Sequence, residues 1–480
     1  MSATVSEIIV FVLLVHTDRM FTAAYILACS YSPAQGARNV DAQFSVRDID
    51  FSLCTHYIYC SAQLDTEEES IVPADPATED GFSGTYKLFN DGKKPYPKVK
   101  TILSVGGATS QHDMAFRKLY SKDNTFRTFA TNALTFIRDK GFDGLNIHWY
   151  TNDEESIRLS FPKLLTALNT AFENDYAGSA LLLTMTGFAF PNPSNRYYDM
   201  IVIQKTVDYI FMPMSLLARD INAEFIDPLY SNFNNPNLHP ALSVNASVVS
   251  LYRMGIPRWY MVVGVTALGH YAKLMNKFNF EPGAPIDEHP LSGPKYEILK
   301  RLAYPEICEM MPTARRYYDD VQKAPYLVTE TTWVGYTDTV SLMEKINFVK
   351  SNNISGMEFS LLDQDDFSGK ACQSGKFPLL SFLKKELNPD PPTTVAPRTT
   401  VRYTTRRATQ APRTIRPMTQ VPHTNTPSTT SKPNIPIETD DQPMLVTYLI
   451  LVLMFVVGFV LGFLLMRFAR TKQRPLGEGE

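Results

Sequence analysis

The side chains best placed for chemistry in this 480-residue chain lie in the segment Gly141–Tyr150. Alternate residues of a strand face opposite sides, so Asn146, His148 and Tyr150 would share one face, with apolar side chains on the other. A polar face of this kind fits the mouth of a parallel β/α barrel, where catalytic groups gather. One interpretation is a site in which His148 acts as a base or pH sensor. The alternative is a hydrogen-bonded cluster that fills the barrel mouth without catalysis.

Strands and helices alternate along the part of the chain that would carry this segment. Amphipathic stretches such as Asn124–Lys140 and Phe161–Glu173 separate short apolar runs. Eight of these runs predict strands: Tyr25–Cys29, Thr55–Ser61, Val99–Val105, Gly144–Trp149, Leu181–Thr186, Tyr209–Met214, Tyr260–Val265 and Met357–Leu361. Together they predict an α/β fold over residues 25–387, a (β/α)8 TIM barrel, with an inserted subdomain at about residues 268–338.

The C-terminal part of the chain predicts a membrane anchor. Residues 444–466 carry no charge, and 23 helical residues rise roughly 34 Å, enough to cross the hydrocarbon core of a bilayer. Basic residues follow this run and acidic residues precede it. The positive-inside rule therefore predicts a single-pass type I protein of the cell membrane, with the barrel extracellular and residues 467–480 as a cytoplasmic tail. The lipid bilayer is thus one expected partner, whereas a net charge of −3 gives no reason to expect nucleic acid.

The segments on either side of the barrel have other compositions. Residues 388–443 contain 14 threonines and 11 prolines, which predicts an extended stalk, either O-glycosylated or unmodified. Residues 1–24 contain the apolar run Ile8–Val15, which predicts a signal peptide. Sequons at Asn245 and Asn353 predict N-glycosylation, so that the protein would be a glycoprotein.

The cysteines fit a secreted domain and no metal site. The chain has five of them, and none is spaced as a C-x-x-C metal motif. Two disulfides and one free thiol would suit an oxidising compartment. We expect neither a cofactor nor a metal.

Several short motifs, in a fixed order, resemble glycoside hydrolase family 18, the chitinases and chitinase-like lectins. The motifs cover nearly all of residues 25–387 and are Cys54–Tyr59, Ser104–Gly107, Phe142–Leu145, Glu306–Glu309, Trp333–Tyr336 and Asp365–Gly369. The resemblance implies a barrel with a small α+β insertion, and disulfides Cys29–Cys54 and Cys308–Cys372. It leaves Cys60 unpaired, and we expect that thiol to face the helices as an inert core group.

The chemistry that the resemblance implies is missing from the fourth-strand motif. The family pattern is D-x-x-D-x-D-x-E, in which the glutamate is the general acid and the preceding aspartate orients the acetamido group of the substrate. This chain has Asp143, Asn146, His148 and Tyr150 at these positions. A phenol titrates near pH 10 and is a poor general acid at neutral pH.

Other positions expected in the sugar cleft are also changed. The tyrosine and aspartate that follow the sixth strand in the family correspond here to Ser215 and Leu216. Tryptophans on which sugar rings would stack correspond to Ala108 and Ser360. Of the three tryptophans in the chain, two lie in scaffold motifs, and we expect Trp259, which precedes the seventh strand, to serve in packing and not as a sugar platform.

These observations predict a catalytically inactive cell-surface protein that acts in recognition or adhesion, with an unknown protein or glycan as its extracellular ligand. One alternative is a lectin that binds chitin or another N-acetylglucosamine glycan weakly. A further alternative is a glycosidase of altered chemistry that uses His148 and Tyr150.

Overall fold

The computed structural model describes residues 25–34, 42–120, 125–189, 191–287, 292–296, 298 and 300–388. Within these ranges, no helix combines the length and the apolar character that a membrane crossing requires. The predicted signal peptide (1–24), transmembrane helix (444–466) and cytoplasmic tail (467–480) lie outside the described residues, as does the predicted stalk from residue 389 onward.

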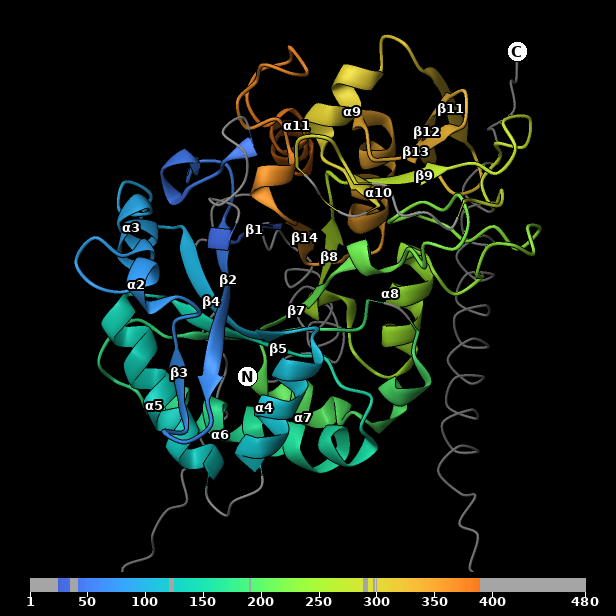
Figure 1. Cartoon of the computed structure of the whole chain (residues 1–480). Coiled ribbons are helices and arrows are strands. Elements are labelled where there is room, and N and C mark those ends of the chain that lie inside the picture. The colour runs from blue at the N-terminus through green and yellow to red at the C-terminus, as the bar shows by residue number, and fades with distance from the viewer. Residues whose placement is uncertain are drawn as a thin grey trace, which may run out of the picture. The chain divides into compact units, whose positions relative to one another are not determined.

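Eight parallel strands form a closed barrel in the order β1-β14-β8-β7-β6-β5-β4-β2, and the pairing of β1 with β2 closes it (Figure 1). The barrel strands are β1 (Ile26–Tyr31), β2 (His56–Asp65), β4 (Lys100–Gly107), β5 (Gly144–Trp149), β6 (Leu182–Thr186), β7 (Tyr209–Met212), β8 (Met261–Val265) and β14 (Gly356–Phe359). The prediction of a (β/α)8 barrel is therefore confirmed, and the predicted strand ends differ from the observed ones by four residues at most.

Helices surround the barrel, and a short strand, β3 (Ser70–Val72), extends β2 as a hairpin. The helices are α2 (Pro76–Glu79), α3 (Thr85–Gly92), α4 (Ser110–Tyr120), α5 (Thr125–Lys140), α6 (Phe161–Glu173), α7 (Met200–Thr206), α8 (Val244–Arg253), α10 (Thr339–Ser351) and α11 (Pro378–Leu387). Their apolar faces and the outward-facing strand residues form one large core. Burial of these faces is what drives the strands and helices to close.

A second, smaller apolar cluster fills the inside of the barrel. It contains one inward-facing residue from most strands, among them Ile26, Ile58, Ile102 and Phe211. Cys60 packs against this inner cluster, so the expectation that its thiol faces the helices is wrong. Tyr57 and Tyr59 face the helices instead, and alternation along β2 turns Cys60 inward. Burial raises the pKa of this thiol to about 12, which keeps it protonated.

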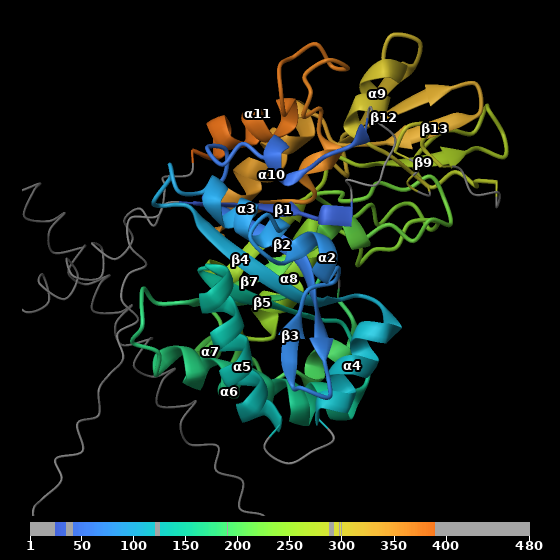
Figure 2. The ribbon, with the colours of Figure 1, turned by 60° about the vertical axis from the view of Figure 1, so that its left-hand side comes forward.

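The insertion follows β8 as a separate five-stranded antiparallel sheet in the order β10-β9-β13-β12-β11. It contains β9 (Gly269–Lys273), β10 (Arg301–Leu302), α9 (Tyr304–Met310), β11 (Arg315–Asp319), β12 (Ala324–Thr329) and β13 (Thr332–Gly335). Figure 2 shows this sheet and α9 at one side of the barrel. The insertion has its own small core around Trp333, and Leu302, Ile307 and Val334 join the main core.

Both disulfides implied by the family resemblance are present. Cys29 on β1 is bonded to Cys54, which lies just before β2, and Cys308 on α9 is bonded to Cys372 in the loop before α11. Cys60 is the free cysteine of the described residues.

Candidate functional site

The polar face of β5 points into the barrel, as its alternation predicts. Asn146 pairs with Ser104 on β4 and with Thr184 on β6, and His148 pairs with Gly106. Gly106 has a φ of +90°, and a Cβ atom there would lie 2.5 Å from the carbonyl oxygen of His148. Glycine is therefore required for β4 to approach β5 this closely. The motif Ser104–Gly107 thus sets the position of β5 at the barrel mouth.

Asn146 is buried and fully engaged by neighbouring hydroxyl groups. Its Nδ2 donates to Ser104 Oγ at 2.9 Å and to Thr186 Oγ1 at 2.9 Å. Its Oδ1 accepts a hydrogen bond from Thr184 Oγ1 at 3.1 Å. Each partner comes from the layer of inward-facing residues on β4 and β6. Asn146 therefore joins three strands and has no charge with which to orient a substrate.

His148 lies one layer nearer the mouth and is held neutral. Burial lowers its pKa to about 4, and the proximity of His112 adds to this effect. His112, on the first turn of α4, forms a 2.9 Å hydrogen bond between its Nδ1 and Thr109 Oγ1. Its ring lies against Gly107, where a Cβ atom would come within 2.7 Å. His112 was not predicted from the sequence; its only signal was its place five residues after the end of a barrel strand.

Tyr150 follows β5 and is 38% exposed. It lines a cavity together with His148, Thr186 at the end of β6, and residues from the loops after β6 and β7, including Tyr198 and Pro213. The cavity volume is about 30 Å³. That is space for about one water molecule, whereas sites for small organic ligands span roughly 300–1,000 Å³. A sugar ring does not fit between Tyr150 and His148 in this conformation.

Asp143, the acid that remains of the family pattern, lies at the opposite end of β5. Its Oδ2 accepts hydrogen bonds from Lys93 Nζ at 2.5 Å and from the backbone N–H of Thr101 at 2.8 Å. Burial alone would raise its pKa, but Lys93, the Thr101 N–H and Lys100 together hold the pKa below its usual value. Asp143 therefore ties β5 to β4 and α3 and takes no part in the barrel mouth.

The other predicted positions of the cleft offer neither an acid nor an aromatic platform. Ser215 and Leu216 lie in a short 3-10 helix directly after β7, and the structure describes the backbone but not the side chain of Leu216. Ala108 is exposed after β4, and Ser360 is half-buried after β14. These four positions therefore do not rebuild the chemistry that β5 lacks.

The three tryptophans are dispersed over the molecule. Trp149 stacks on Phe116 at a centroid distance of 4.8 Å and donates from Nε1 to Asp113 Oδ1 at 2.9 Å. Trp333 is fully buried in the insertion. Trp259, expected to pack against the fold, is instead 66% exposed on a one-turn 3-10 helix (Arg258–Tyr260) just before β8, in which no residue is buried.

The two sequons differ in their surroundings. Asn353 is exposed in the turn between α10 and β14. Asn245 is half-buried on the first turn of α8 and borders a surface recess with the exposed Phe233. The hydroxyl of Ser247, part of the same sequon, is buried and donates to Ala189 O at 2.7 Å.

The family motif Asp365–Gly369, which follows β14, has a structural role. Asp365 and Asp366 are both buried. Asp365 Oδ2 accepts a hydrogen bond from the N–H of Leu380 at 3.0 Å, at the start of α11. Asp366 Oδ2 accepts from the N–H of Cys372 at 2.8 Å. The two carboxyl groups thus hold α11 and the disulfide loop against β14.

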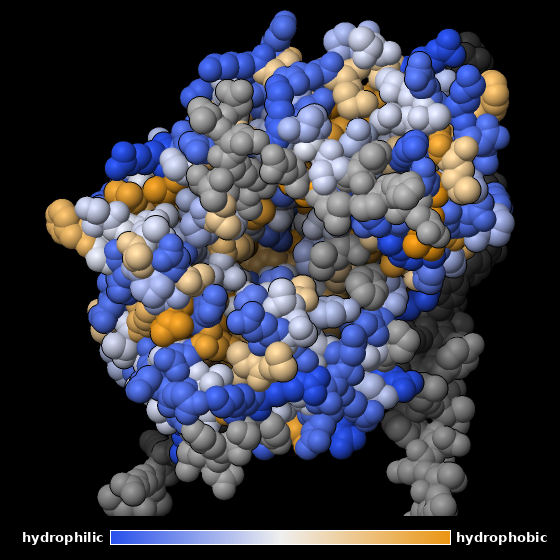
Figure 3. Space-filling view, viewed as in Figure 1, coloured by the Kyte–Doolittle hydropathy of each residue, from blue (hydrophilic) through white to orange (hydrophobic). Residues whose placement is uncertain are grey.

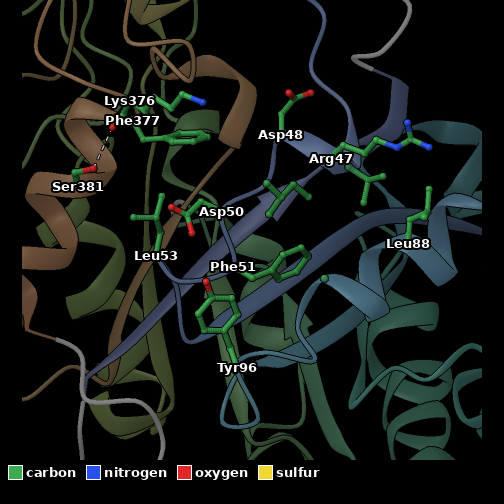
Figure 4. Close-up of a pocket in the computed structure, with 13 residues that line it drawn as sticks. Arg47, Asp48, Asp50, Phe51, Leu53, Leu88, Tyr96, Lys376, Phe377 and Ser381 are labelled. Atoms are coloured by element: carbon green, nitrogen blue, oxygen red, sulfur yellow. Dashed lines mark hydrogen bonds between the residues drawn. The ribbon is translucent and has the colours of Figure 1, made fainter.

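A larger recess of about 490 Å³ lies between the loop after β1, α3 and the start of α11 (Figure 4). Aromatic residues such as Phe51, Tyr96 and Phe377 line it, and Asp48 and Asp50 lie at its edge. Asp48 accepts hydrogen bonds from the side chain and backbone of Ser45, and Asp50 accepts one from the N–H of Ser52. The acids in this recess are therefore engaged in local turns.

Comparison with known proteins agrees with the motifs and the fold. The model of glycosyl hydrolases family 18 matches residues 27–365. Human chitinase-3-like protein 2 is 29% identical over 376 residues, which cover 76% of this chain and 93% of the human protein. Chitotriosidase-1 of Mus musculus is 29% identical over 379 residues, covering 75% of this chain and 78% of the mouse protein.

A solved structure is similar over the same region. It is described as "Human YKL-39 is a pseudo-chitinase with retained chitooligosaccharide binding properties", and it aligns with a TM-score of 0.70 and 27% identity, over 76% of this chain and all of that chain. Proteins named as enzymes and a protein described as a pseudo-chitinase thus share this barrel. Because the family model matches most of its length, this chain belongs to glycosyl hydrolase family 18.

Proposed function

We propose that this protein is a catalytically inactive member of its family that works by recognition. The observation that carries the proposal is the set of side chains that β5 and the residue after it present at the barrel mouth. Asn146 is locked by three hydroxyl groups, His148 is neutral, and Tyr150 stands where the family pattern has its general acid. No carboxylate lies on the inward face of β5, so this strand offers no general acid for glycosidic cleavage.

A glycan is the ligand class that the comparisons favour. Human YKL-39 is described as a pseudo-chitinase that retains chitooligosaccharide binding, which supports weak binding of an N-acetylglucosamine glycan by this chain. A protein ligand is the other candidate, and the losses of stacking residues at Ala108 and Ser360 support it. We further propose display at the cell surface through the uncharged run 444–466, with N-glycans at Asn245 and Asn353.

Two measurements on the full-length protein, purified in detergent, test the proposal. Release of a chromogenic group from a chitooligosaccharide substrate is expected to equal the buffer control, with an active chitotriosidase as the reference. Substrate turnover that Tyr150→Phe abolishes would instead establish altered catalysis. A glycan array separates the ligand classes: retention on N-acetylglucosamine oligomers supports the glycan, and an array without retained glycans leaves a protein ligand.

A further inference from the structure

A buried glutamate inside the barrel is used neither by the scaffold motifs nor by the β5 cluster. Glu358 lies on β14, in register with Ala28 on β1 and Gly264 on β8. Its residue exposure is only 7%, and Ser30 Oγ donates to its Oε1 at 2.5 Å. Alternation along β14 turns this side chain inward, because Met357 and Phe359 belong to the helix-facing core.

No basic side chain balances Glu358 among the residues that the structure describes. None of the ion pairs found there includes it, and burial raises its pKa with only the Ser30 hydrogen bond opposing the change. Other buried carboxylates have either a cation, as Asp227 has Lys345 at 2.7 Å, or backbone N–H donors, as Asp365 has. An unpaired buried carboxylate is costly, and buried charges in proteins are normally paired. Glu358 is therefore an acceptor that a bound cationic group would satisfy.

The inward-facing residues around Glu358 are small. The residues beside it in register are alanine and glycine, and the next inward-facing residues toward the mouth are Ser30 on β1 and Ser360 on β14. Ser360 and Cys60, which also faces inward, are partly exposed. Figure 3 shows a hollow near the middle of this face of the molecule, in the region where Figure 1 labels β14, β8 and β7. The described inward-facing neighbours of this carboxylate toward the mouth are therefore small, which would let a compact cationic group approach it.

The choice of cation follows from the side chains present. No three metal-binding side chains converge in the described part of the chain, so the donor set around Glu358 does not suit a metal ion. A primary ammonium group needs one carboxylate and a few hydroxyl or carbonyl acceptors. Resting on the proposed glycan ligand, we infer that Glu358 is the recognition group for the free amine of a 2-amino sugar, so that the protein prefers partly or fully deacetylated chitooligosaccharides.

The test compares two hexamers on the full-length protein in detergent: hexaglucosamine and hexa-N-acetylchitohexaose, each titrated at pH 7 by calorimetry. The wild-type protein is expected to bind hexaglucosamine more tightly. Glu358→Gln keeps the shape and the Ser30 hydrogen bond but removes the charge. The variant should raise the Kd for hexaglucosamine about tenfold or more, as expected for the loss of a charged hydrogen bond. Its Kd for the N-acetylated hexamer should stay within about threefold of the wild-type value.

Two controls keep the result interpretable. Glu309→Gln removes one charge from a partly exposed glutamate on α9, and it should change neither affinity. The melting temperature of Glu358→Gln should equal or exceed that of the wild type, because the variant loses an unpaired buried charge. If Glu358→Gln does not fold, Glu358→Met replaces it in the binding measurements. Equal affinity of Glu358→Gln and wild type for hexaglucosamine overturns the inference. Binding of only the N-acetylated hexamer overturns it and leaves the glycan proposal standing, whereas binding of neither hexamer removes both.

Discussion

The side-chain amide of Asn146 donates to Ser104 Oγ across the β4–β5 pair at 2.9 Å. The position of the second aspartate in the family pattern is thus occupied by an amide that joins neighbouring strands. The hydroxyls of Thr184 and Thr186, two successive inward-facing residues of β6, complete the arrangement. These polar atoms are therefore engaged with one another, and their hydrogen bonds contribute to the stability of the barrel.

Asn146→Leu is expected to destabilise the protein by about 2–4 kcal/mol, because it leaves the hydroxyls of Ser104, Thr184 and Thr186 without their shared partner. Urea denaturation of the full-length protein measures the change. Asn279→Leu, at an exposed position of the insertion, is the matched control and should stay within about 0.5 kcal/mol of wild type. Equal stability of Asn146→Leu and the control would mean that the cluster contributes nothing to the fold.

His148 should make the protein sensitive to acid. Its folded pKa is about 4, whereas an unfolded histidine titrates near 6.5. The unfolded state therefore binds more protons between these values, and stability is lost as the pH falls from about 6.5 to 4, by up to about 3 kcal/mol. His148→Gln should flatten this part of the stability profile, and substitution of the exposed His239 should not. Parallel profiles for wild type and His148→Gln would contradict the prediction.

Asp365 should make the protein less stable as the pH rises, which is opposite to the effect of His148. Burial raises its folded pKa to about 7, above the unfolded value near 3.9. The folded state then binds the proton more tightly, so the stability from this group is present below about pH 4 and is lost as the pH rises to about 7, by an amount on the order of 4 kcal/mol. Asp365→Asn should remove the dependence, with the exposed Asp320→Asn as control. Thermal melts from pH 4 to 8 check this, and an unchanged slope would refute it.

The disulfide Cys308–Cys372 closes a loop of 64 residues. Its loss in the double variant Cys308→Ala/Cys372→Ala is expected to cost about 4 kcal/mol, since the unfolded chain regains the entropy of that loop. Guanidinium denaturation measures the change. Cys60→Ala, which leaves both disulfides intact, is the control. A double variant no less stable than Cys60→Ala would show that this bridge is dispensable.

N-glycosylation is expected to be more complete at Asn353 than at Asn245. Asn353 is exposed in a turn, whereas Asn245 is half-buried on α8 beside Ser247, whose hydroxyl is already bonded in the fold. Asn353→Gln should abolish one band shift on glycosidase treatment of protein from a secretory cell. Peptide mass spectrometry reports the occupancy of each site, and full occupancy of Asn245 alone would reverse the expected order.

The sequence by itself determined the architecture. Alternating apolar runs and amphipathic segments predicted all eight barrel strands, since burial beneath helices requires those patterns. The sequence also determined that no acid stands at the positions of Asn146, His148 and Tyr150, because the comparison with the family pattern needs only the residue types and their spacing. Both disulfides followed from the family resemblance and are present in the fold.

The tertiary structure decided which face each strand presents and what each group contacts. Both faces of β2 are apolar, so periodicity did not reveal that Cys60 faces inward, and only its packing against the inner cluster did. Glu358 is one charged residue in a short apolar run, and closure of the barrel is what removes it from water and from any described cation. His112 lies on the first turn of α4 and Trp259 on a one-turn 3-10 helix. The surroundings of both depend on contacts between segments far apart in the chain, which no local pattern encodes.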